Sequence, residues 1–247
     1  MQLVRAIWFQ FKARIFGKGT IAKLGHNGGK INVILHRTAS TKVLYANPPD
    51  WPHMLLWERC LNNGDLFLDI GANIGSYSIL AASLGAKVIA VEPATDTVEL
   101  PKDNIRLNNM SIEVINSAVG SKSGKMSFST NLDTVNRYDP DGTTLVDVTT
   151  LDEIIGDRIV SGMKIDIEGY EIEALKGCAK ALSEHRIQLL QLEWNSAADR
   201  KPIEQLLTEH DYILMVPTPD AELIPWNFNA TYSEDDLFAI PISKSNP

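Results

Sequence analysis

The sequence predicts a doubly wound α/β fold, in which helices cover both faces of a mostly parallel sheet and an antiparallel strand closes one edge. Three observations predict this fold. Short apolar runs alternate with segments of helical spacing, a glycine-punctuated turn follows one of these runs at residues 71–75, and four of the runs end in an acidic residue. A small extension of helix and strand is expected in front of the domain.

The size and composition of the chain fit one such domain plus a small addition. It has 247 residues, of which 44% are hydrophobic and 22% are charged, as is ordinary for a soluble globular protein. No uncharged apolar run is long enough to cross a bilayer, and basic residues interrupt the N-terminal segment where a secretory signal would lie. Cys60 and Cys178 are too few for a disulfide framework. We therefore expect a cytoplasmic protein with both thiols reduced.

Charge is distributed unevenly along the chain. Residues 1–49 contain eight of the 23 Lys and Arg residues and no acid, which gives this segment a charge of +8. The rest of the chain combines the other 15 basic residues with all 31 acids, which leaves a charge of −16. Because phosphate binding is largely electrostatic, this acidic body argues against nucleic acid as a partner.

The basic N-terminal segment begins with a predicted helix at residues 3–16, whose apolar stripe lies opposite Arg5 and Lys12. One interpretation is that residues 1–18 lie on an anionic membrane at its cytoplasmic face. The alternative is that this helix packs on the main domain or on a second subunit of a homo-oligomer. Short strands are expected next, at Ile31–His36 and Lys42–Tyr45.

The best boundary in the chain is the Asn-Pro-Pro-Asp sequence at residues 47–50. It separates a basic extension, residues 1–50, from a main domain, residues 51–247. The main domain is predicted to open with a helix at about residues 51–61 and a strand at 66–70. The turn at residues 71–75 and a helix at 76–84 follow, and this strand–turn–helix unit is typical of nucleotide-binding α/β domains.

The middle of the chain continues the alternation of strands and helices. Strands are expected at residues 87–91, 112–115 and, more weakly, 124–129, with a helix at 95–108. Pro101 is expected to start or kink that helix, because proline lacks the amide that a helix interior needs. Residues 130–148 are predicted to form a long loop, either an acceptor-binding lid or a plain flexible connection.

The last third repeats the pattern. A strand at Met163–Ile167 precedes a helix predicted to turn Glu171 and Glu173 outward, and a strand at Ile187–Leu192 precedes a helix at Asp199–His210. Tyr212–Val216 and Leu237–Ile240 are expected to close the sheet.

Acidic residues stand where four of the predicted strands end: Asp69, Glu92, Asp166 with Glu168, and Glu193. Acids are poor strand residues and are costly to bury without a partner. Because parallel strands end at the same edge of a sheet, we expect these carboxylates to build one polar site.

The turn indicates which ligand this site takes. Glu92 follows Gly71 by 21 residues, close to the spacing at which a carboxylate accepts hydrogen bonds from ribose hydroxyls. Residues 71–75 read Gly-x-x-x-Gly and lack the Gly-x-Gly-x-x-Gly that brings a pyrophosphate close to the backbone. Asp69 would also repel a pyrophosphate, whereas it suits an ammonium group. S-adenosylmethionine (SAM) is therefore favoured over NAD.

Several motifs resemble those of a known family. Phe67–Gly75 resembles the SAM-binding motif of class I methyltransferases, whose sheet is Rossmann-like. Together with Val91-Glu92-Pro93, Thr150–Ile154 and Lys164–Glu171, it resembles the FkbM family of SAM-dependent methyltransferases, over roughly residues 60–195. That resemblance implies O-methylation of hydroxyl groups on sugars, glycans or polyketide-like products. One interpretation is that the acceptor is a lipid-linked or polymeric glycan.

The resemblance also implies roles for individual residues. The methionine part of SAM would be held by Asp69, Gly71, Asn73 and Gly75, the ribose by Glu92, and the adenine by Ser117 and Ala118. Asp166 and Glu168 would lie where the methyl group meets its acceptor.

The residues at the acceptor end leave several interpretations open. Asp166 and Glu168 share one face of a strand, where they could act as a base, share an Mg²⁺ ion, or be structural, with Glu168 capping the next helix. Glu193 and Trp194 could bind a sugar ring or belong to the core. The alternative functions are an NAD-dependent oxidoreductase and a non-catalytic SAM-binding protein.

Overall fold

The structure is a computed structural model, which describes residues 20–27, 29–34, 38–93, 95–128, 142, 144–194, 197–226 and 236–242. An eight-stranded sheet forms its centre, with the strand order β12-β11-β13-β10-β9-β3-β4-β5. The strands are β3 (Leu66–Ile70), β4 (Lys87–Val91), β5 (Ile112–Ile115), β9 (Gly162–Ile165), β10 (Leu190–Glu193), β11 (Tyr212–Pro217), β12 (Leu223–Pro225) and β13 (Asp236–Pro241). The five strands from β5 to β10 are parallel, and β13 runs antiparallel between β10 and β11. The predicted fold class is confirmed.

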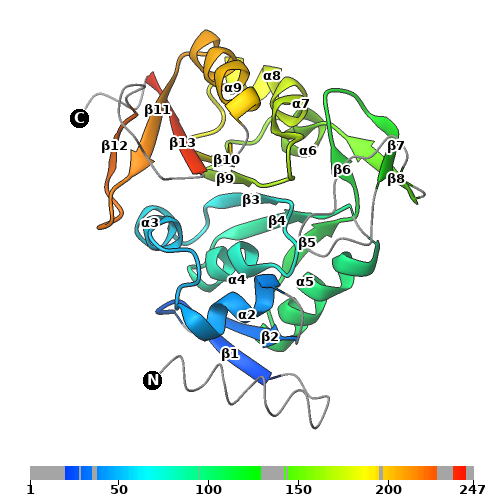
Figure 1. Ribbon diagram of the computed structural model, residues 1–247, viewed down its shortest axis with the longest axis vertical. Coiled ribbons are helices and arrows are strands. Elements are labelled where there is room, and N and C mark those ends of the chain that lie inside the picture. Colours follow the sequence, from blue (N-terminus) through cyan, green and yellow to red (C-terminus); the bar gives the residue numbers. More distant parts are fainter. Residues whose placement is uncertain are drawn as a thin grey trace.

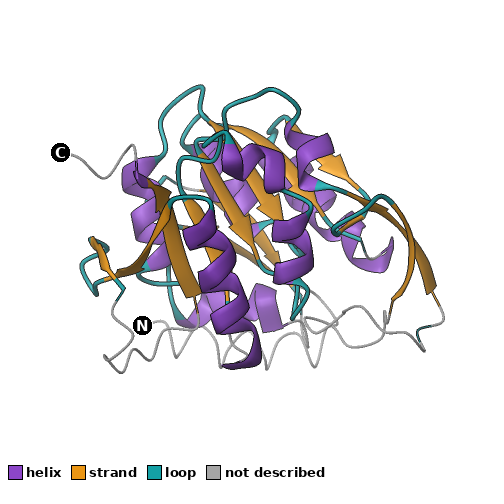
Figure 2. Cartoon of the chain, turned by 90° about the horizontal axis from the view of Figure 1, so that it is seen from above, coloured by secondary structure: helices purple, strands orange, loops and turns teal. Residues whose placement is uncertain are grey.

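Helices cover both faces of this sheet (Figures 1 and 2). One face carries α2 (Thr38–Tyr45), α3 (His53–Cys60), α4 (Ser76–Ser83) and α5 (Thr95–Asn108). The other carries α6 (Leu151–Ile155), α7 (Glu171–Lys176), α8 (Ala179–Ser183) and α9 (Ala197–Glu209). Successive side chains of β3 point to opposite faces, so Phe67 lies in one apolar cluster while Leu68 and Ile70 lie in the other.

The N-terminal extension packs on the α4 and α5 side of the domain. β1 (Thr20–Leu24) and β2 (Gly29–Val33) form an antiparallel hairpin, and Leu24, Ile31 and Val43 share an apolar cluster with Ile79. The strand predicted at Lys42–Tyr45 is wrong, because these residues end helix α2. A window of four residues with one buried side chain fits either periodicity. The helix predicted at residues 3–16, and the membrane or subunit contact of residues 1–18, lie outside the described residues.

A small second sheet extends the domain beyond β5. It has three strands, β6 (Ala118–Val119), β7 (Gly124–Phe128) and β8 (Thr144–Thr149), in the order β6-β8-β7. The loop predicted at residues 130–148 is therefore too long, since its last residues pair with β7 as β8. Residues 130–141 and 143 lie outside the described part of the chain.

Pro101 lies inside α5 rather than at its start. Its side chain packs over the glycine turn, since a Cβ added to Gly75 would lie 3.1 Å from the Cβ of Pro101. Pro101 therefore contacts the turn from a position inside a helix, where proline is intrinsically unfavourable. Within the described residues, no helix has the length and apolar character that crossing a bilayer requires.

Candidate active site

A cavity of about 270 Å³ opens at the carboxyl ends of the parallel strands. It brings together most of the residues predicted from the sequence. Those that line it are Asp69, Gly71, Asn73, Glu92, Ser117, Ala118, Asp166, Glu168 and Glu193. Gly75 and Trp194 are not among its lining residues.

The conformation of the glycine turn is set by contacts with neighbouring residues. Gly71, Asn73 and Gly75 have φ values of 79°, 49° and 81°, a region that glycine and asparagine adopt most easily. A Cβ on Gly71 would lie 1.9 Å from the carbonyl oxygen of Asp166, so no larger residue fits there. Gly71 is therefore required where β3 meets the end of β9, and Gly75 where the turn meets Pro101.

Glu92 and Ser117 line the part of the cavity beyond this turn. Glu92 is buried, and its Oε2 accepts a hydrogen bond of 2.9 Å from the amide of Asn73. A carboxylate can accept several hydrogen bonds, so this role is compatible with binding ribose hydroxyls. The Ser117 hydroxyl lies 2.9 Å from the carbonyl oxygen of Asp147 and anchors the start of β6 to β8. The apolar side chains of Met126 and Phe128 also line the cavity. These two residues were not predicted from the sequence.

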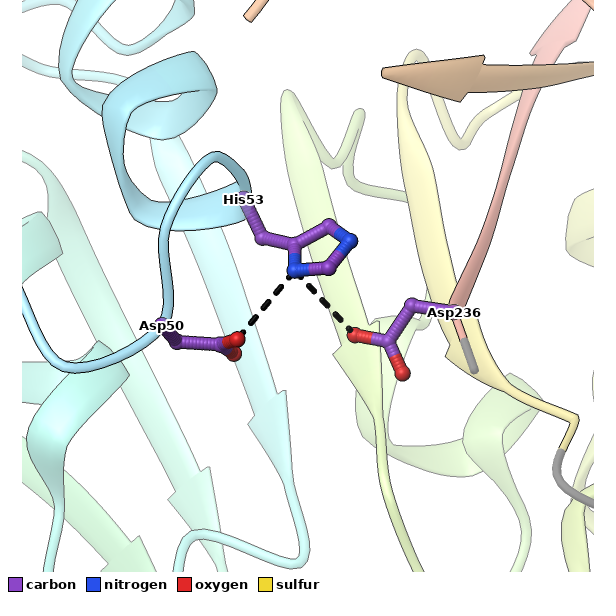
Figure 3. A group of neighbouring side chains, drawn as sticks. All are labelled: Asp50, His53 and Asp236. Carbon is purple, nitrogen blue, oxygen red and sulfur yellow. Dashed lines mark hydrogen bonds and ion pairs between the residues drawn. The ribbon is translucent and has the colours of Figure 1, made fainter. Parts of the chain in front are cut away.

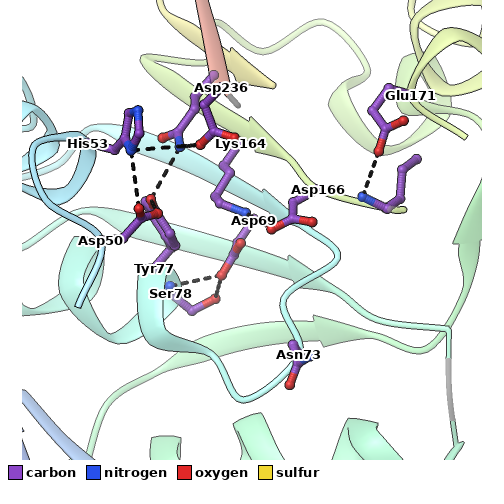
Figure 4. Close-up of polar contacts among 12 residues, drawn as sticks. Asp50, His53, Asp69, Asn73, Tyr77, Ser78, Lys164, Asp166, Glu171 and Asp236 are labelled. Atoms are coloured by element: carbon purple, nitrogen blue, oxygen red, sulfur yellow. Dashed lines mark hydrogen bonds and ion pairs between the residues drawn. The ribbon is translucent and has the colours of Figure 1, made fainter. Parts of the chain in front are cut away.

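Asp69 joins β3 to α4. It is only 1% exposed, and its Oδ2 accepts hydrogen bonds from the amide of Ser78, at 2.9 Å, and from the Ser78 hydroxyl, at 2.6 Å (Figure 4). Burial raises the pKa of Asp69, although Lys164 and Ser78 act in the opposite direction. This carboxylate therefore fixes the start of α4 behind the turn.

Lys164, which was not predicted as a site residue, is a buried cation among carboxylates. Its Nζ lies 2.7 Å from Oδ2 of Asp166 and 4.8 Å from the centre of the Tyr77 ring (Figure 4). Burial alone would lower the pKa of Lys164, but Asp166, Asp236 and Asp69 outweigh it and raise the pKa. The signal in the sequence was a lysine inside an otherwise apolar strand.

The turn after β9 presents Glu168 to the cavity. Glu168 has a φ of 55°, which is unusual for a residue with a side chain, and Gly169 has a φ of 92°. Oε1 of Glu171 accepts hydrogen bonds from the amides of Ile167, at 3.0 Å, and Gly169, at 3.2 Å. Glu171 is 3% exposed, so its predicted outward orientation is wrong. It points inward because it holds this turn.

Replacing Glu171 with alanine is expected to lower the free energy of unfolding by about 1–3 kcal/mol, since two amides lose a buried acceptor. Glu171→Gln should retain most of that stability, because the amide oxygen can accept the same hydrogen bonds. Urea denaturation of the two variants checks this. Equal stability of Glu171→Ala and wild type would show that the turn needs no clamp.

Glu193 completes a group of three carboxylates with Asp166 and Glu168, whose oxygens lie within 4.8 Å of one another. Burial first, and then Asp166 and Glu168, raise the pKa of Glu193 to about 9. Oxygen ligands in this arrangement suit a divalent cation such as Mg²⁺. Trp194 instead lies in the core, where its ring centroid is 5.2 Å from that of Trp226 and the guanidinium carbon of Arg200 is also 5.2 Å away.

The raised pKa of Glu193 implies a pH-dependent stability. The folded carboxyl titrates at about 9 against an ordinary value of 4.5, so its contribution is complete below pH 4.5 and is lost as the pH rises toward 9. We expect the melting temperature of wild type to fall between pH 5 and pH 8 by more than that of Glu193→Gln. Parallel pH profiles for the two proteins would contradict this assignment.

A largely buried polar network lies at one end of the cavity, and two of its residues, Asp50 and Tyr77, also line the cavity. Nδ1 of His53 lies 3.2 Å from Oδ1 of Asp50 and 3.9 Å from Oδ2 of Asp236 (Figure 3). The Tyr77 hydroxyl donates a hydrogen bond to Asp50 (Figure 4). The side-chain amide of Gln191 lies 3.2 Å from the Tyr77 hydroxyl. These residues come from four separate elements and the segment before α3, so no sequence motif signals them.

The central sheet has the Rossmann-like arrangement of class I SAM-dependent methyltransferases. The METTL16 MTase domain is similar to this chain, with a TM-score of 0.50 and 16% identity over 96% of this chain and 77% of that one. Residues 69–214 match the sequence model of the methyltransferase FkbM domain, and the chain belongs to the FkbM methyltransferase family.

Two further proteins are similar in sequence. The hexuronic acid methyltransferase AglP of Haloferax volcanii is 28% identical over 151 residues, which cover 59% of this chain and 62% of that protein. A putative ribosomal RNA large subunit methyltransferase, MJ1649 of Methanocaldococcus jannaschii, is 31% identical over 105 residues, or 41% of this chain and 26% of that protein. The chain thus spans less than two thirds of either relative.

Proposed function

We propose that this protein transfers the methyl group of SAM to a hydroxyl group of a sugar or glycan. The observation that carries the proposal is one cavity in which the glycine turn and Glu92 adjoin three carboxylates at the ends of β9 and β10. Membership of the family supports methyl transfer, and similarity to a hexuronic acid methyltransferase favours a sugar acceptor. The net charge of −8 favours such an acceptor over RNA.

The protein would contribute mainly by aligning the two reactants. The turn at residues 71–75 and Glu92 would hold the donor, with its adenine against Ala118 and Phe128. SAM supplies an activated methyl group, so alignment can account for up to roughly 7–11 kcal/mol of the barrier. An oxygen lone pair forms the new bond to the methyl carbon while the carbon–sulfur bond breaks, and S-adenosylhomocysteine leaves.

Asp166 is our candidate to take the hydroxyl proton, with Glu168 orienting the acceptor. Lys164 holds one oxygen of Asp166, while the Asp166 side chain remains 40% exposed. General base action of this kind contributes typically about 10²- to 10⁴-fold. Glu193 faces the same space and could hydrogen-bond the sugar.

A divalent cation bound by Asp166, Glu168 and Glu193 is the alternative for activating the hydroxyl. Treatment with EDTA followed by added Mg²⁺ separates the two mechanisms. Loss and recovery of turnover would favour the cation, whereas turnover that is insensitive to EDTA would favour direct base action.

The proposal is tested by incubating the enzyme with SAM carrying a deuterated methyl group and a panel of glycans, including lipid-linked ones. Mass spectrometry should find the deuterated methyl group on a sugar. Calorimetry with SAM and NAD is the companion measurement, since an oxidoreductase would bind NAD instead. Binding of SAM without transfer to any acceptor would favour a non-catalytic SAM-binding protein.

A further inference from the structure

We propose that Asp50 binds the ammonium group of the methionine part of SAM, and that Lys42 binds its carboxylate. This inference rests on the proposed use of SAM as methyl donor. Both side chains line the cavity, and both precede residues 69–214, the part of the chain that matches the family model. They would therefore be features of this chain that the family motifs do not include.

The geometry of Asp69 motivates a search for another partner of the ammonium group. Asp69 is 1% exposed, and one of its oxygens already accepts two hydrogen bonds from Ser78. A direct contact with a ligand would need an accessible carboxylate. The Asp50 side chain is 40% exposed and lines the same cavity.

Asp50 lies next to the first turn of α4. The hydroxyl of Tyr77, the second residue of that helix, donates a hydrogen bond to Oδ2 of Asp50. Tyr77 follows Gly75 by two residues, so Asp50 stands beside the turn that would carry the methionine part of the donor. In the view of Figure 4, Asp50 lies next to Tyr77, and Lys164 lies between Asp50 and Asp166.

The buried network prepares Asp50 as a fixed anion. His53 holds Oδ1, Tyr77 holds Oδ2, and Asp236 and Gln191 lie behind these two donors. Burial acts to raise the pKa of Asp50, but the hydrogen bonds from His53 and Tyr77, together with the charges of His53 and Lys164, outweigh it and lower the pKa to about 2. A carboxylate can accept further hydrogen bonds, so its cavity side can still receive an ammonium group.

The other charges of the cavity have different positions or partners. Glu92 accepts from the Asn73 amide, Asp166 pairs with Lys164, and Glu168 and Glu193 lie with Asp166 at the acceptor end. Among the described lining residues the cations are Lys42 and Lys164. Lys164 is buried against Asp166, whereas Lys42 is exposed. Asp50 and Lys42 thus match the two charges of a zwitterion.

Calorimetry with two ligands tests the proposal without any acceptor. S-adenosylhomocysteine contains the amino-acid group, and 5′-methylthioadenosine lacks it. Loss of one charged hydrogen bond should weaken S-adenosylhomocysteine binding by about 10- to 100-fold in Asp50→Asn and in Lys42→Met, with little change for methylthioadenosine. Asp157→Asn, at an exposed acid outside the cavity lining, is the control and should bind both ligands like wild type.

Other binding results would contradict the proposed roles of Asp50 and Lys42. Equal losses for both ligands in Asp50→Asn would mean that Asp50 acts through the buried network, and unchanged binding would remove it from the site. If Asp50→Asn fails to fold, Lys42→Met still decides, because Lys42 is exposed on α2: an unchanged ratio of the two affinities would overturn the proposal. Folded wild type that binds neither ligand would contradict the proposed function itself.

Discussion

Replacing Asp166 with asparagine is expected to slow methyl transfer by about 10²- to 10⁴-fold while SAM affinity stays within a few-fold of wild type. Asparagine has nearly the same size and can still approach Lys164, but it cannot take a proton from the acceptor. The measurements are the turnover rate with the acceptor glycan and calorimetry with SAM. Unchanged turnover would remove Asp166 from the mechanism.

Two controls separate loss of the base from loss of the site. Asp157→Asn changes an acid that is 90% exposed and should have wild-type turnover. A large loss of SAM affinity in Asp166→Asn would instead mean that the end of β9 has moved. Such a movement would disturb the glycine turn, because the carbonyl oxygen of Asp166 lies against Gly71.

Replacing Lys164 with methionine is expected to lower the free energy of unfolding by about 3–5 kcal/mol, since it removes the cation from a set of buried charges. Asp69 is buried, Asp166 loses its partner at 2.7 Å, and Asp236 loses a favourable charge. Denaturation in urea measures the difference. Lys180→Met is the matched control, because Lys180 is 58% exposed and should change stability by no more than about 0.5 kcal/mol.

The same variant has a predicted pH dependence. The pKa values of Asp69 and Asp236 are raised by burial, so these groups take up protons at a higher pH than ordinary carboxyls do. Protonation of these carboxyl groups removes the repulsion between neighbouring carboxylates, which the charge of Lys164 offsets in wild type. The stability gap between wild type and Lys164→Met should therefore narrow as the pH is lowered from 8 toward 5. Equal stability of Lys164→Met and Lys180→Met would contradict the assigned role of Lys164.

Sequence periodicity predicted the sheet and the position of the site because both depend on local patterns. Strands such as Leu66–Ile70 and Lys87–Val91 are mostly apolar, and parallel strands place the acids at or just after their carboxyl ends at one edge of the sheet. Asp69, Glu92, Asp166 and Glu193 were found in this way, and all four line the cavity.

The features that sequence reasoning missed depend on tertiary contacts. Glu171 follows the polar side of a helical pattern, yet it is drawn inward by the amides of Ile167 and Gly169. For Trp194 the sequence allows either a sugar contact or a core position, and the alternation of side chains after Glu193 takes it into the core. Asp50, Tyr77 and Asp236 meet only after the sheet has formed, so their spacing in the chain carries no signal.

The most direct test of the account is the position of the transferred methyl group. The purified product of the reaction with deuterated SAM is treated with mild base and examined by mass spectrometry. We predict a deuterated methyl ether on a sugar hydroxyl, which survives the base and is not formed by Asp166→Asn. A base-labile methyl ester, a methyl group on nitrogen, or full product formation by Asp166→Asn would contradict the account.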